Sequence, residues 1–222
     1  MEVPDYFLPR PAAAPDVDAF QALWAAQVEP GTGGAVDYRL PDPRWQFLCW
    51  LADTKAVVLH GSGHASIEEF EPRKADDVSE FGARTAVFAA SDGLWPMYFA
   101  LVDRGRVQSL VNGCAHAIDL DGGRSGDYYY FSIDQEALAT HPWRPGTVYV
   151  LPRETFEPQP EEEWHGLRLA STQWASPVPV RPLARIAVRP EDFPFLDRVN
   201  GHDPEVVGVR AAADPGGFPW RD

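Results

Sequence analysis

Proline is the residue that most restricts how this chain can fold. The sequence of 222 residues contains 22 prolines, which is about twice the usual share. Each proline fixes φ and removes a backbone N–H donor, so long helices are not expected to dominate the fold. The length suits a single domain with one sizeable core. An apolar share of 45% is that of a globular protein and excludes a wholly disordered chain.

The charge balance restricts the class of partner. The chain has 33 acidic and 19 basic side chains and a net charge of −14, which repels phosphate backbones and argues against broad nucleic-acid binding. A small anionic ligand held in a local pocket stays compatible with this charge. No stretch of 18 apolar residues is present, so no membrane span is expected. The first residues lack the pattern of a signal peptide, and we expect a cytoplasmic protein.

Periodicity and turn signals predict a mixed set of short elements. Residues 4–15 are expected to form an extended arm, and Asp16 is expected to cap a helix that reaches Val28. A second helix is expected over 43–53, and a third follows Ser91-Asp92-Gly93. The expected strands lie at 55–60, 84–89, 106–111, 127–133, 146–151 and 182–188. This order predicts a single α+β domain with helices first and a mostly antiparallel sheet after them.

The end of the strand over 55–60 carries the most informative motif. His60 is followed there by Gly61, Ser62 and Gly63. Glycines allow a ligand to approach the backbone closely, and an imidazole and a hydroxyl can both bond a ribose or a carboxamide. The alternative is that His60 only caps the end of the sheet and the glycines only form a turn. The spacing of these residues alone favours this alternative slightly.

A second strand, turn and helix start follows at 84–101. An aromatic side chain at the end of this strand offers a flat face to a planar ring. Trp95 and Phe99 are more simply explained as core residues, whereas Phe88 and Tyr98 remain open between core and ligand contact.

The order of these motifs resembles the ADP-ribosyltransferase superfamily, in its branch with a His-Tyr-Asp/Glu site, which includes small rifampicin-modifying transferases. Leu59-His60-Gly61-Ser62 is similar to the strand that binds the nicotinamide and ribose of NAD. Val87-Phe88-Ala89-Ala90 is similar to the second strand, which supplies an aromatic, and a helix with Ala100 follows it. The likeness covers residues 55–190 and implies a split sheet of ADP-ribosyltransferase type with NAD as substrate. The whole layout also resembles a bacterial family to which no activity is attached.

The resemblance implies roles for the residues that match it. His60 corresponds to the histidine that binds the ribose, Gly61 to the glycine whose backbone holds the carboxamide, and Ser62 belongs to the same cofactor-binding motif. Phe88 or Tyr98 corresponds to the aromatic that stacks on the nicotinamide.

The third catalytic position departs from the family's pattern. Gln173 is its best match, but a neutral amide cannot supply the negative charge that stabilises an oxocarbenium-like transition state. Glu154 is the fallback acid, and Asp92 is another. This departure concerns catalysis more than fold.

Metal sites are not predicted. His60 and His64 lie four residues apart on a turn and lack a third ligand nearby. Cys49 and Cys114 form neither a CxxC zinc motif nor a disulfide framework.

Two functions therefore stand as expectations. The first is NAD-dependent ADP-ribosyl transfer, or NAD cleavage, in a cleft around His60, Phe88 and Gln173, with a small molecule or a protein as the acceptor. The alternative is a non-catalytic nucleotide-binding or regulatory protein that keeps the pocket. The expected organisation is an arm and helical addition over 1–53, a core over 54–200 and a loose tail over 201–222.

Overall fold

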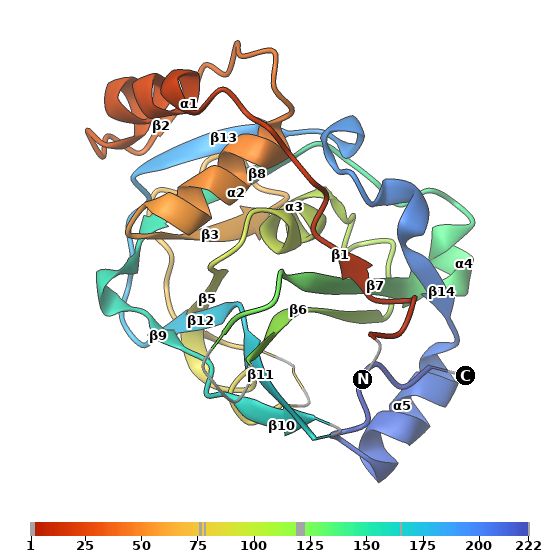
Figure 1. The fold of residues 1–222 in the computed structure, drawn as a ribbon. Coiled ribbons are helices and arrows are strands. Elements are labelled where there is room, and N and C mark those ends of the chain that lie inside the picture. Colours follow the sequence, from red (N-terminus) through yellow and green to blue (C-terminus); the bar gives the residue numbers. More distant parts are fainter. Residues whose placement is uncertain (1–2, 76, 78, 119–122, 165, 222) are drawn as a thin grey trace.

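The chain folds into two β-sheets with helices between and around them (Figure 1). The computed structural model describes residues 3–75, 77, 79–118, 123–164 and 166–221. Nearly all strand pairs are antiparallel; among the described residues, only the β13–β2 and β14–β7 pairs are parallel. The expectation of a mixed α+β chain with mostly antiparallel strands is confirmed.

The first sheet, which we call the His60 sheet, is assembled from distant parts of the chain. Its order is β2 (Gly34–Ala35), β13 (Ala184–Val188), β8 (Gly146–Pro152), β3 (Val57–Ser62), β5 (Thr85–Ala90), β12 (Gln173–Ser176) and β9 (Glu157–Pro158), with β4 (Arg73–Lys74) beside β5. The two strands singled out by the sequence, β3 and β5, are neighbours in this sheet, as predicted.

The second sheet lies beside the two chain ends in Figure 1. Its order is β1 (Leu8–Pro9), β7 (Tyr128–Asp134), β6 (Leu110–Ile118), β11 (Leu167–Ser171) and β10 (Glu162–Trp164), with β14 (Asn200–His202) also paired to β7. The helices are α1 (Val17–Leu23), which continues as the π-helix η1 (Trp24–Val28), α2 (Arg44–Thr54), α3 (Leu94–Leu101), α4 (Gln135–Leu138) and α5 (Pro204–Ala213). Three 3-10 turns are described as well: η2 (Arg153–Thr155), η3 (Pro190–Asp192) and η4 (Leu196–Arg198).

Helix α3 lies in the core between the two sheets. On one side it packs so closely on β3 that a Cβ at Gly61 would lie 1.7 Å from the Pro96 carbonyl oxygen. On the other side, Tyr98 stacks on Phe131 of β7 with 4.6 Å between ring centroids. Apolar side chains of α2, α3 and both sheets form one continuous buried cluster.

One segment of chain joins the sheets. Strand β11 belongs to the second sheet, and β12, which begins two residues after β11 ends, belongs to the His60 sheet. Thr172 stands at the crossing, where its N–H donates to the Cys114 carbonyl and its carbonyl accepts from Ser91 N–H. Its hydroxyl donates to the carboxylate of Asp92 at 2.9 Å.

Several expectations from the sequence are corrected. The tail over 201–222 is not loose, because β14 pairs with β7 and α5 buries Val207 and Ala211. The arm over 4–15 contributes β1 to the second sheet. The strand expected at 106–111 begins later, at Leu110. No helix in the described residues combines the length and apolar character that a membrane span requires.

Candidate functional site

The gap between β3 and β5 is the main feature at the predicted site. Strand β3 pairs with β8 along its whole length, from Val57 to Ser62, but with β5 only through Leu59 and Ala90. Beyond Leu59, the edge of β3 that faces β5 has no strand partner in the described chain. Along an antiparallel edge, alternate residues direct both N–H and C=O toward that edge. Arg153 N–H donates to the Ala56 carbonyl, so the even-numbered residues of this stretch face β8, and Gly61 alone of residues 60–62 directs its N–H and C=O into the gap.

The His60 ring bridges this gap. Its Nδ1 lies 2.6 Å from the carbonyl oxygen of Phe88 in β5, and its ring centroid is 4.6 Å from that of Phe70. Burial lowers the pKa of His60, and the hydrogen bond to the Phe88 carbonyl opposes the shift. A neutral imidazole that donates from Nδ1 to a carbonyl has Nε2 as its acceptor. His60 is thus fixed in one tautomer by its partner.

Gly61 and Ser62 have local structural roles in the same segment. Gly61 leaves room for the backbone of α3, because a Cβ at this position would collide with backbone atoms of Pro96 and Ala100. The Ser62 hydroxyl accepts a hydrogen bond from His64 N–H at 3.1 Å and so closes the turn after β3. The alternative explanation, in which the glycine motif serves the sheet and the turn, therefore accounts for part of it.

The prediction that His60 and Phe88 point into the same cleft is wrong. Paired Leu59 and Ala90 share a face of the sheet, and side chains alternate along a strand. Phe88 therefore lies on the face of Leu59, where it packs near Phe81, and His60 lies on the opposite face.

Tyr98 is not available as a stacking aromatic. Its side chain is fully buried, and its hydroxyl donates to the Ser132 carbonyl at 3.2 Å. Burial raises the pKa of Tyr98 well above its ordinary range. Tyr98 is a core residue, which corrects its expected contact with a cofactor. Phe99, which was assigned to the core, is half-buried at the edge of the main cluster.

The two candidates for the third catalytic position lie in different places. Gln173 pairs with Ala90 and is half-buried on the Phe88 face of the sheet. Glu154 is exposed on η2, which follows the end of β8 that pairs with Val57. His60 lies nearer the other end of β3, so Glu154 does not belong to the gap.

Known proteins give no guide to this site. Neither family models nor curated proteins nor solved structures match the chain. In the described residues, no three His, Cys, Asp or Glu side chains gather as a metal site requires. The site must therefore be interpreted from its own geometry.

Asp92, named above as a second fallback acid, has a structural task. Its Oδ1 accepts from the N–H groups of Leu94 and Trp95, each at 2.8 Å, and Oδ2 accepts from the Thr172 hydroxyl. Asp92 is fully buried, and this burial raises its pKa to about 6. The carboxylate caps α3 and links it to Thr172, where the chain passes from one sheet to the other. Both of its oxygens already accept hydrogen bonds.

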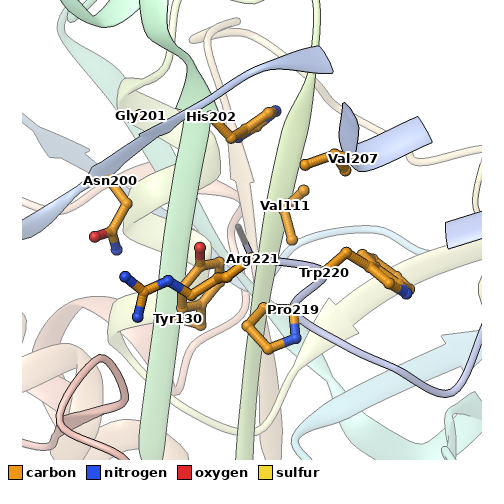
Figure 2. Close-up of a pocket in the computed structure, with 9 residues that line it drawn as sticks. All are labelled: Val111, Tyr130, Asn200, Gly201, His202, Val207, Pro219, Trp220 and Arg221. Carbon is orange, nitrogen blue, oxygen red and sulfur yellow. The ribbon is translucent and has the colours of Figure 1, made fainter. Parts of the chain in front are cut away.

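A cavity of about 160 Å³ lies elsewhere, under the C-terminal segment (Figure 2). Figure 2 shows Arg221 between Asn200 and Tyr130, with Trp220 on the other side of the cavity. The ring nitrogens of His202 are both engaged, by Ser132 at 2.7 Å and by Ser109 at 2.9 Å. This cavity contains none of the residues that the sequence singled out, and its histidine has no free nitrogen to act as a base. We therefore place the candidate site at the gap between β3 and β5.

Proposed function

We propose that the protein binds NAD, or a closely related pyridine nucleotide, in the gap between β3 and β5. One observation carries the proposal: the two strands part after Leu59, and the His60 ring bridges them through the Phe88 carbonyl. The sequence resemblance alone suggests NAD as the ligand, and the placement of His60 and Phe88 on opposite faces of the sheet does not match the cleft that this resemblance implies.

The chemistry of the gap fits the nicotinamide end of such a ligand. A carboxamide carries one donor group and one acceptor, so it can bond a free backbone N–H and C=O on the edge of β3. The Nε2 of His60 has no protein partner in the described chain and can accept from a ribose hydroxyl. Phe88 is half-buried on the face of the sheet opposite His60, where its ring packs edge to face near Phe81.

The same geometry favours binding over fast transfer. Departure of nicotinamide leaves positive charge on the ribose, which a nearby carboxylate stabilises. Gln173 is neutral, Glu154 lies at the far end of β3, and Asp92 is committed to capping α3. Within the described chain, no charged group contributes to the pKa shift of His60. We infer a nucleotide-binding or regulatory protein whose NAD turnover is slow.

Titration calorimetry with NAD tests this proposal. We expect wild-type protein to bind one NAD, and His60→Ala to lose about 1–3 kcal/mol of binding, because a buried partner is left unpaired. The control is His141→Asn, since His141 is exposed and its φ of 50° is one that asparagine also adopts. Absence of NAD binding at millimolar concentration overturns the proposal. A parallel nicotinamide-release assay decides the catalytic question: rapid release by wild-type protein contradicts a mainly binding role.

A further inference from the structure

Arg144 is a half-buried cation without a protein partner. Its Nε is inaccessible to solvent and has no hydrogen-bond acceptor. Arg10 and Arg44 also have an unbonded Nε, but their guanidinium groups pair with Asp53 and Asp192. No acid among the described residues pairs with Arg144. A buried donor left unbonded is costly, so this Nε requires an explanation such as a water, an ion or a ligand that bonds it.

The guanidinium lies against the glycine segment that follows β3. A Cβ at Gly63 would lie 1.9 Å from one terminal nitrogen of Arg144 and 2.8 Å from Nε. The backbone beneath it is anchored, because Arg144 N–H donates to the Leu101 carbonyl at the end of α3. Trp143 forms a bridge with Val102 beside it. Arg144 is therefore held in place by secondary structure, and Gly63 provides the space for its head.

We propose that Arg144 binds the phosphate part of the nucleotide whose nicotinamide end occupies the gap. This inference rests on the proposed function. A guanidinium presents a planar fork of donors that matches two phosphate oxygens. Gly63 lies in the turn after β3, two residues beyond Gly61 and so at most about 7 Å from it, and a ribose separates a base from its phosphate on a similar scale.

The overall charge of the protein is unfavourable for an anionic ligand. A net charge of −14 repels an anionic ligand at long range. A fixed, unpaired cation at the end of β3 offsets that repulsion locally. The competing explanation is that Arg144 only stabilises the carbonyl end of α3 through the helix dipole. That explanation predicts an effect on stability and none on ligand choice.

The test compares two ligands, NAD and nicotinamide riboside, which lacks phosphate. We expect Arg144→Gln to weaken NAD binding at least tenfold while the affinity for nicotinamide riboside stays within twofold. Arg144→Lys should restore part of the NAD affinity. Arg198→Gln, which removes an exposed arginine on η4, is the control for the loss of one charge. Urea unfolding of each variant verifies that it is folded.

The outcomes separate the two proposals. If wild-type protein binds neither ligand, the proposed function fails. If wild-type protein binds both, and Arg144→Gln binds NAD as wild type does, only the role of Arg144 fails. An equal loss of affinity for both ligands also overturns the role of Arg144, because such a loss shows that the substitution disturbs the whole site.

Discussion

Replacing Asp92 tests how α3 is held between the two sheets. Asp92→Ala removes the acceptor for two helix N–H groups and for the Thr172 hydroxyl. Each buried donor left unbonded costs about 1–3 kcal/mol, with some relaxation. We expect a total loss of about 3–5 kcal/mol of unfolding free energy, which is a large fraction of the stability of an ordinary domain. Asp92→Asn keeps an oxygen for both N–H groups and an amide that can donate to Thr172, so its loss should stay near 1 kcal/mol.

The raised pKa of Asp92 adds a dependence on pH. The pKa is about 6 in the folded protein, mainly because of burial, and about 4 in the unfolded chain. Between these values the folded state binds more protons than the unfolded state, so this group makes the protein more stable as pH falls. Between pH 7.5 and pH 5 the gain is about 1–2 kcal/mol, and Asp92→Asn should lack it.

Urea unfolding of the three proteins at pH 5 and pH 7.5 measures both effects. Comparing wild type with Asp92→Asn at each pH cancels the contributions of other titrating groups. The account of Asp92 is refuted if Asp92→Ala loses less than about 1 kcal/mol. It is also refuted if Asp92→Asn is as damaging as Asp92→Ala.

Two further substitutions test the packing of α3. Gly61→Ala should destabilise the protein by more than about 2 kcal/mol, since its Cβ meets the Pro96 carbonyl; Gly208→Ala, in α5 with open space around it, should be neutral or stabilise by up to about 1 kcal/mol. A thermal melt of each variant checks both, and equal effects would contradict the close contact. Tyr98→Phe should lose about 1 kcal/mol with its hydrogen bond to Ser132, without weakening NAD binding; a binding defect measured by calorimetry would restore Tyr98 as a ligand contact.

Local signals in the sequence were sufficient for some elements. The Asp16 side chain accepts from Ala19 N–H at the start of α1, as a capping residue should. Helix α2 runs over Arg44–Thr54, within one residue of the prediction at each end. Strands β3 and β5 are neighbours because two short apolar runs with turns after them fit the same sheet. These features depend on a few consecutive residues.

Features that depend on distant pairing were not predictable in the same way. Strand β10 overlaps an acidic, proline-containing stretch and pairs locally with β11, whereas β11 and β12 also pair with β6 and β5, far away in the chain. The sequence predicts a loose tail that ends in Gly216-Gly217-Phe218-Pro219-Trp220, whereas the structure has helix α5 there, which buries Val207 and Ala211. Its stability comes from packing on the second sheet, which no local pattern reports.

The candidate site also combines features that the local sequence predicts with features that depend on distant pairing. The position of His60 at a strand end was predictable, but the face on which Phe88 lies depends on register, and one residue of shift reverses every side chain. The sequence does not single out Arg144, because the role proposed for it rests on the lack of an acidic partner in the described chain and on its contact with Gly63. Such information exists only in three dimensions.

A crystal structure of the protein with NAD tests the central claim most directly. We predict density for the nicotinamide in the gap between β3 and β5, with its carboxamide beside the backbone of Gly61 and a ribose hydroxyl near His60 Nε2. Density for NAD in the cavity beside Arg221 and Trp220 instead, with the gap closed, would contradict the claim.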